Sequence, residues 1–272
     1  MASLKGYRGK PIIDNIPEFA LLQNDELGKE ISSRVHAQYQ GTPAELTSAP
    51  DRGKPFRESN PFKLFAVDSV ARDLGWRVML PEEAQLLLDL NQMPESTCTY
   101  KDLGLVMDFS GKNHDLALNL YERLTHEEKD LDRFPTVFTG LKPLKSEFGK
   151  YGLAFDVAPY TQMRTAKILS SSSGNFQDED PELSITGLPS KLGEGTRRLY
   201  TLNQHKPSLD NLGVVRLYLV WGSSLGSDGV GDLGDSYEVG RVVLVGGKAT
   251  AQKISQYLIT LHKKRQELEA QL

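Results

Sequence analysis

The spacing of hydrophobic residues along the chain predicts a mixture of helices and strands. Apolar side chains recur at helical spacing in several stretches, so we expect helices over residues 17–40, 61–74, 81–90, 115–124 and 249–272. Runs rich in β-branched and aromatic residues predict strands over residues 76–80, 103–108, 136–141, 152–158, 197–201, 214–221 and 241–245. The mixture indicates the α+β class.

Capping residues support two of these helices. Asn60 can cap the helix that starts at Pro61, and Gly75 is a natural stop for it. Pro81 is followed by two acidic residues, which are favourable at a helix N-terminus and predict the next helix start. Two polar stretches predict surface loops, residues 41–60 and residues 170–196.

Residues 222–237 are unusual because they are drawn only from Gly, Ser, Leu, Asp, Val and Tyr. The segment lies between the strands predicted over residues 214–221 and 241–245, and it has little to bury. It therefore predicts a displayed surface, in which Leu225, Leu233 and Tyr237 fix the residues between them. A flexible Gly/Ser-rich loop is the alternative interpretation.

Two ligand motifs in this segment lack the context that they need. The sequence GVGDLG, ending at Gly234, matches a dinucleotide-binding pattern, but a strand instead of a helix is expected after it. Asp228, Asp232 and Asp235 could share a cation, yet they lack the alternating ligands and terminal glutamate of a calcium loop. We therefore expect no nucleotide and no metal here.

The composition is that of an ordinary globular chain of 272 residues, 39% hydrophobic and 25% charged. A net charge of −4 gives no basic footprint, so we expect no nucleic-acid partner. Cys98 is the single cysteine, which excludes an intrachain disulfide and offers no multi-cysteine metal site. The sequence has no apolar leader and no run long enough to span a bilayer, so we expect a cytoplasmic protein by default, with export by another route left open.

Motifs for catalysis are absent from the sequence. The five histidines have no metal-ligand spacing, and there is neither a nucleophile elbow nor a phosphate-binding lysine loop. We expect no catalytic residue, no metal ligand and no cofactor.

Two blocks of the sequence resemble a known family. Residues 75–90, GWRVMLPEEAQLLLDL, resemble a block of C-type-lectin-like domains of the formylglycine-generating-enzyme type, with one extra residue, Met79, before the Leu-Pro pair. Residues 215–245 resemble the C-terminal variable region of target proteins of diversity-generating retroelements, in which small variable residues follow a Trp and end in a Gly-Arg-Val strand. Residues 59–72, SNPFKLFAVDSVAR, indicate an archaeal-type member.

The resemblance implies a C-type-lectin-like fold, with short antiparallel sheets flanked by helices and with helical extensions at both ends. It divides the chain into an arm and helix over residues 1–60, a ligand-binding domain over residues 61–248 and a C-terminal helix over residues 249–272. The variable region would span about residues 214–245.

The resemblance also implies a restricted alphabet, that is, a limited set of residue types at the variable positions. Mutagenesis of the template adenines in AAY codons, where Y is a pyrimidine, gives codons with any first two bases followed by a pyrimidine. All six residue types of the 222–237 segment are reachable by such codons, whereas Trp221 and Glu238 are not and would be constant. Lys, Gln and Met are also unreachable, and none of them occurs between residues 214 and 245.

The ligand contacts implied by the resemblance lie along the variable region. We expect them at Tyr218, Val220, Gly222, Ser223, Ser224, Gly226, Ser227, Asp228, Gly229, Val230, Gly231, Asp232, Gly234, Asp235, Tyr237 and Val239. The tyrosines would give large contact area with few rotatable bonds, and the aspartates would give polar specificity. Leu225, Leu233, Arg241 and Val243 would be scaffold.

The expected function is non-catalytic binding of an unknown protein or other macromolecular ligand. One alternative is a phage-tail-like or cell-surface adhesin that assembles as a homo-oligomer through residues 249–272. An enzyme of the formylglycine-generating type is less favoured, because that chemistry needs active cysteines and Cys98 lies far from the C-terminal block.

Overall fold

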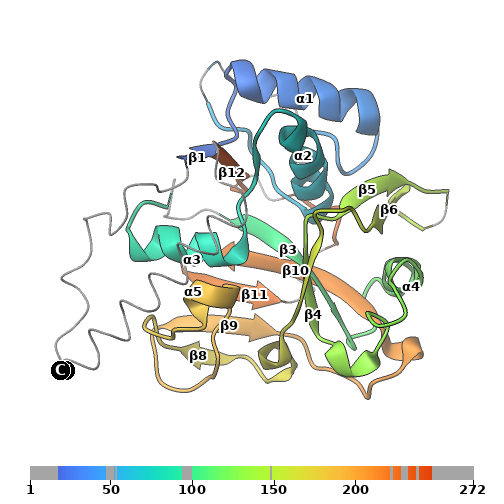
Figure 1. The fold of residues 1–272 in the computed structure, drawn as a ribbon, viewed down its shortest axis with the longest axis vertical. Coiled ribbons are helices and arrows are strands. Elements are labelled where there is room, and N and C mark those ends of the chain that lie inside the picture. The colour runs from blue at the N-terminus through green and yellow to red at the C-terminus, as the bar shows by residue number, and fades with distance from the viewer. Residues whose placement is uncertain are drawn as a thin grey trace.

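A computed structural model describes most of the chain between residues 18 and 246. The described residues are 18–46, 52, 54–93, 100–147, 149–220, 223–227, 232–236 and 239–246. The helix predicted over residues 249–272 lies outside them. Within the described part the fold is α+β, as the sequence predicts, with a mixed seven-stranded sheet and two smaller sheets (Figure 1).

The seven-stranded sheet crosses the middle of the molecule in the order β7-β4-β3-β10-β11-β9-β8. Its neighbours are antiparallel except β11 and β9, which are parallel. The strands are β3 (Lys101–Asp108), β4 (Thr136–Thr139), β7 (Gln162–Thr165), β8 (Gly174–Phe176), β9 (Arg197–Thr201), β10 (Gly213–Val220) and β11 (Ser224–Ser227). The strands predicted from residues 103, 136, 197 and 214 are therefore confirmed in this sheet.

The two smaller sheets join distant parts of the chain. One has β12 (Val243–Gly246) between β1 (Glu18–Leu21) and β2 (Arg77–Val78), and the other pairs β5 (Lys142–Lys145) with β6 (Leu153–Asp156). The first and last described strands are thus neighbours, with Glu18 opposite Gly246.

Five helices are present in the described part of the chain, namely α1 (Glu26–Tyr39), α2 (Pro61–Asp73), α3 (Pro81–Asp89), α4 (His114–Glu122) and α5 (Leu183–Thr186). Helix α2 starts as predicted, because the Asn60 side chain accepts a hydrogen bond from the Lys63 amide at 2.8 Å. Gly75, with φ of 79°, follows its end. None of the described helices has the length and apolar character needed to cross a membrane.

Two sequence predictions are corrected. The helix expected from residue 17 begins at Glu26, where Asp25 caps it, and residues 18–21 form β1 instead because they pair with β12. The stretch over residues 170–196, expected as a polar surface loop, contains β8 and α5 and buries Phe176, Leu183 and Leu188 in the core.

The large sheet separates two hydrophobic cores. Val214 of β10 belongs to the core under α1, α2 and α4, whereas Val215, Leu217 and Leu219 belong to the core under α3 and α5. This alternation is the period-two pattern of a strand buried on both faces. It directs Arg216 and Tyr218 toward the first core, on the side of α2.

Residues 75–90 are held in place by buried contacts. Arg77 makes a two-pronged ion pair with Glu83 at 2.5 and 2.7 Å, and the Leu80 amide donates to the same carboxylate at 2.8 Å. Trp76 covers Gly246, where a Cβ atom would lie 2.3 Å from the indole ring. The distinctive residues of the block therefore hold β2, α3 and β12 together.

Candidate ligand-binding surface

Part of the segment expected as a displayed surface is an interior strand of the seven-stranded sheet. Residues 224–227 form β11, which pairs with β10 on one side and with β9 on the other. Leu225 is fully buried, as its predicted role as an anchor requires. Small residues form a strand here because neighbours on both sides supply main-chain hydrogen-bond partners.

Three of the expected contact residues lie inside the protein. Tyr218 is 7% exposed and stacks on Tyr100 with a ring-centroid distance of 4.8 Å. Gly226 lies against the Tyr218 ring, where a Cβ atom would be 2.0 Å from the nearest ring carbon. Ser227 is 2% exposed. The expectation that Tyr218, Gly226 and Ser227 are displayed is wrong for this folded state, because their places are filled by packing within the sheet.

The remaining expected contacts within the described residues reach the surface. Asp235 and Val239 are exposed, and five others are half-buried, namely Val220, Ser223, Ser224, Asp232 and Gly234. Six expected contacts lie outside the described residues, namely Gly222, Asp228, Gly229, Val230, Gly231 and Tyr237. Ligand binding at all of these positions stays a prediction.

The 232–236 turn is held by a buried arginine. Arg216 is 1% exposed, and its Nη2 donates to the carbonyl oxygens of Asp232 at 2.6 Å and Leu233 at 3.2 Å, and also to that of Asp235. All three acceptors are main-chain atoms. The turn is therefore fixed by an interaction that does not depend on which side chains it carries.

A buried carboxylate compensates the charge of Arg216. Asp102 accepts hydrogen bonds from Ser59 Oγ at 2.6 Å and from the Tyr100 hydroxyl at 3.3 Å, and that hydroxyl accepts from Arg216 Nη1 at 3.4 Å. Burial raises the pKa of Asp102, and the positive charge of Arg216 opposes the rise. Burial raises the pKa of the Tyr100 hydroxyl, the negative charge of Asp102 adds to the rise, and Arg216 opposes it.

Other anchors of the segment also act on its main chain. Asn60 Nδ2 donates to the Gly234 carbonyl at 3.1 Å, and the Leu233 amide donates to the Tyr151 hydroxyl at 3.2 Å. Arg197 Nε donates to the Ser223 carbonyl at 2.8 Å. Burial lowers the pKa of Arg197 to about 10.

Main-chain bonds to Tyr100 continue this pattern after the turn. Its amide donates to the Val239 carbonyl at 3.1 Å, and its carbonyl accepts from the Arg241 amide at 2.8 Å. The predicted scaffold residues Leu233 and Val243 are buried, and Arg241 is half-buried. At the described positions between β11 and β12, the segment is therefore anchored mainly through its backbone.

Side-chain contacts of the turn lie at its surface. Asp232 forms an ion pair with Lys150 at 2.6 Å and accepts from the Gly234 amide, while Asp235 accepts from the Asp232 amide. Burial tends to raise the pKa of Asp232, but the hydrogen bonds from Lys150, Tyr151 and the Gly234 amide together with the charge of Lys150 outweigh it, so the pKa is lowered. No cluster of three or more potential metal ligands occurs among the described residues.

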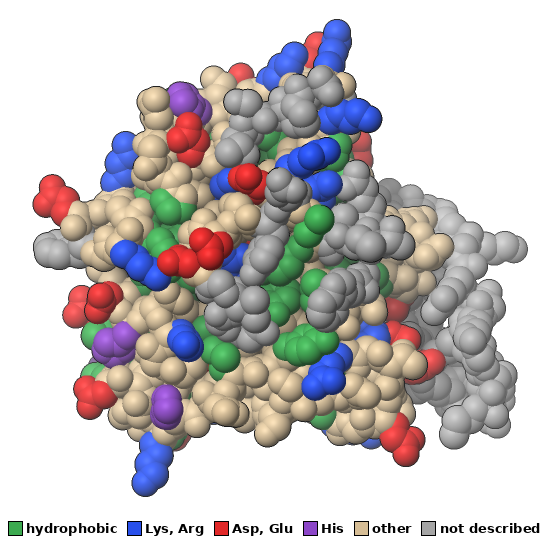
Figure 2. Space-filling model, turned by 180° about the vertical axis from the view of Figure 1, so that it is seen from behind, with side chains coloured by type: hydrophobic (Ala, Val, Ile, Leu, Met, Phe, Trp, Pro, Cys, Tyr) green, Lys and Arg blue, Asp and Glu red, His purple; other side chains and the backbone are tan. Residues whose placement is uncertain are grey.

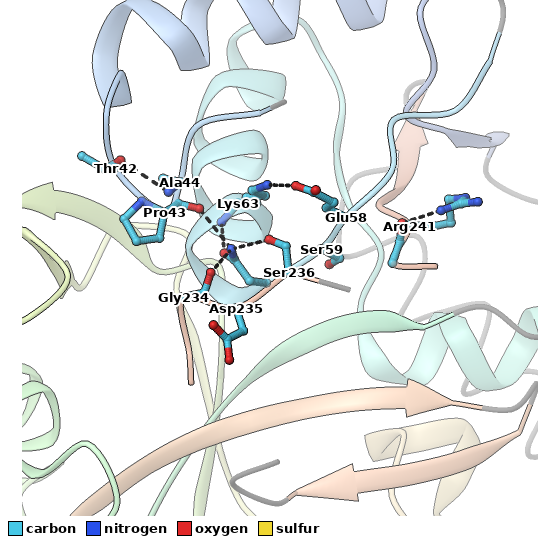
Figure 3. A network of polar contacts seen from close by, with 12 residues as sticks. Thr42, Pro43, Ala44, Glu58, Ser59, Lys63, Gly234, Asp235, Ser236 and Arg241 are labelled. Atoms are coloured by element: carbon cyan, nitrogen blue, oxygen red, sulfur yellow. Dashed lines mark hydrogen bonds and ion pairs between the residues drawn. The ribbon is translucent and has the colours of Figure 1, made fainter. Parts of the chain in front are cut away.

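The polar side of the turn faces α2. Figure 3 shows Gly234 and Ser236 directed toward Pro43 and Lys63, and the Asp235 carboxylate directed away from them. Ser236 Oγ accepts a hydrogen bond from Asn60 Nδ2 at 2.9 Å. Residues 235–236 and 239–242 are not helical and lead into β12, so the helix required by a dinucleotide fingerprint does not follow Gly234.

The residues that position this surface were not predicted from the sequence. Arg216, Asn60 and Tyr151 hold the turn, and Ser236 lies on it. An arginine between the apolar residues of a strand was the one available signal, since a buried arginine must find several acceptors.

Comparison of the chain with protein-family models, with curated proteins and with solved structures found no match. The assignment of a function therefore depends on the geometry of this surface and on the resemblance of the two sequence blocks.

Proposed function

We propose that this chain is a non-catalytic ligand-binding protein with a C-type-lectin-like scaffold, whose surface within residues 214–245 is diversified by retroelement-driven adenine mutagenesis. Its partner is a protein or other macromolecule. The observation that carries the proposal is the bonding of Arg216 to main-chain carbonyls of the 232–236 turn.

A diversified surface has to keep its shape while its side chains change. Main-chain acceptors meet this requirement, because every residue type offers the same carbonyl oxygen. A preformed backbone also avoids the entropy cost of ordering a loop on contact with a ligand, so each new set of side chains is presented ready to bind.

The restricted alphabet supports the same proposal. The exposed positions Asp235 and Val239, and the half-buried Ser223 and Ser224, all carry residues reachable by mutated AAY codons. Arg216, the anchor, sits in the strand before the small-residue segment.

The proposal is tested by the genomic sequence around the coding region. We expect a near-repeat of the segment that encodes residues 214–245, beside a reverse-transcriptase gene, with differences only at template adenines. Sibling copies should differ at the exposed positions and keep Arg216. If the substitutions among siblings scatter evenly along the chain, the proposal fails.

A further inference from the structure

A groove of about 810 Å³ borders the 232–236 turn. Gly234 and Ser236 form one wall, which we call the exchangeable wall because it belongs to the proposed diversified segment. The opposite, constant wall comes from α1, and Pro43, Leu46 and Phe56 contribute apolar surface. The volume of the groove is within the range of about 300–1,000 Å³ that is typical of ligand sites.

The constant wall is a polar stripe of α1. Lys29, Ser32, Ser33 and His36 follow the spacing i, i+3, i+4 and i+7, which puts them on one face of the helix. Ile31, Val35 and Tyr39 occupy the opposite face and are buried in the core. The orientation of this stripe is therefore fixed by the packing of α1 on α2.

The groove presents hydrogen-bond donors, and its charged lining residues are Lys29, Lys63 and Glu45. Glu45, its acidic lining residue, already uses both oxygens, one with His36 at 2.8 Å and one with the Gly41 amide at 2.7 Å. The structure gives the Lys29 side chain no ion pair or hydrogen bond with any described residue. Lys63 is buried and pairs with Glu58 at 2.6 Å, which uses one of the three donors of its ammonium group.

We propose that this groove binds an acidic peptide segment of a protein partner. A carboxylate of the segment pairs with Lys29 and accepts from the hydroxyls of Ser32 or Ser33, while an apolar side chain covers Leu46 and Phe56. The constant wall then provides affinity for acidic segments in general, and the exchangeable wall selects among them. This inference rests on the proposed function, since it treats Gly234 and Ser236 as diversified.

The test selects a phage-displayed random dodecapeptide library against the full chain. Selected peptides are then synthesised with a fluorescent label, and their binding is measured by fluorescence polarisation. Variants Lys29→Gln and Ser236→Tyr probe the two walls, and Lys112→Gln, at an exposed lysine that does not line the groove, is the charge-matched control. Thermal melting followed by circular dichroism checks that each variant is folded.

We expect the selected peptides to be rich in Asp and Glu. Lys29→Gln should weaken their binding by about tenfold, the loss expected for a hydrogen bond to a charged group, and Lys112→Gln should leave it unchanged. Ser236→Tyr should change which acidic peptides are selected, because it puts a large side chain on the exchangeable wall, where it also replaces the acceptor of Asn60 Nδ2.

Failure to select any peptide, or equal binding to wild type and Lys29→Gln, would overturn the inference. If binding depends on Ser236 but not on Lys29, the groove assignment is wrong and the proposed diversified surface stands. If binding depends on Lys29 while Ser236→Tyr changes neither affinity nor the selected peptides, the groove is supported and diversification at this wall is contradicted.

Discussion

Arg216 Nη2 lies 2.6 Å from the main-chain carbonyl oxygen of Asp232, 16 residues further along the chain. The bond joins the centre of the large sheet to the 232–236 turn at the surface. Nη2 thereby finds an acceptor inside the protein, and the Asp232 carbonyl, which also accepts from the Asp235 amide at 3.0 Å, gains a second donor. It follows that the turn should tolerate side-chain exchange but not the loss of Arg216.

Replacement of Arg216 by Met should destabilise the protein by about 3–5 kcal/mol, as expected when one partner of a buried charge network is removed. Asp102 would keep a buried charge without its counterion, and three carbonyls would each lose one donor. Urea unfolding measures this loss. Arg198→Met, at an exposed arginine of β9, is the matched control, and an equal effect of the two substitutions would contradict the prediction.

Asn60→Asp should loosen the turn while leaving helix α2 in place. An aspartate keeps the cap on the Lys63 amide, but it loses the Nδ2 donor that holds the Gly234 carbonyl and Ser236 Oγ. We expect a cost of about 1–3 kcal/mol, because these two half-buried acceptors lose their donor.

Amide hydrogen exchange distinguishes these two regions in Asn60→Asp. Exchange should accelerate at residues 234–236 and remain slow in α2. Faster exchange in α2 with an unchanged turn would show that the role of Asn60 is confined to the helix.

Gly226→Ala should cost about 1–3 kcal/mol, the range for overpacking a filled core. The added Cβ would lie 2.0 Å from the ring of Tyr218, which is itself stacked on Tyr100. Ser224→Ala, on the same strand but half-buried, should change the free energy of unfolding by less than about 0.5 kcal/mol. Similar values for the two variants would show that Gly226 is not tightly packed.

The Lys150–Asp232 pair should make a small contribution to stability that is lost in acid. The folded-state pKa of Asp232 is lowered, so its stabilising effect is present above the usual aspartate pKa and disappears as the pH falls through the folded value. Because both side chains are partly exposed, we expect less than about 1 kcal/mol.

Unfolding of wild type and Asp232→Asn, compared from pH 7 to pH 3, checks this contribution. The difference between the two proteins should shrink toward acid and also in high salt. A difference that grows as the pH falls would contradict the direction of the pKa change.

Local signals in the sequence were sufficient for much of the fold. Asn60, Pro61 and Gly75 marked both ends of α2, because caps act within one helical turn. Strand β1 could not be predicted, since residues 18–21 continue an apolar helical pattern and become a strand only through pairing with β12.

The candidate surface was less predictable, because its arrangement is tertiary. Ser224 to Ser227 have the composition of a loop, and only β10 and β9 on either side make them a strand. Tyr218 and Arg216 are two residues apart and therefore lie on the same buried face of β10, which the period-two pattern of a strand could have indicated. The partners of Arg216 could not be predicted, because they are main-chain carbonyls, which every residue has.

The proposed function requires that the backbone of this segment keeps its shape whichever side chains it carries. The most direct test uses two libraries of displayed variants, in which chosen positions are encoded by randomised codons that end in a pyrimidine. One library varies positions that reach the surface, namely Val220, Ser223, Ser224, Asp232, Asp235 and Val239, and the other varies the buried Tyr218, Gly226 and Ser227. The fraction of members that keep wild-type resistance to protease is measured in each. We predict that most members of the first library keep it and most of the second lose it. Equal loss of resistance in both libraries would contradict the account.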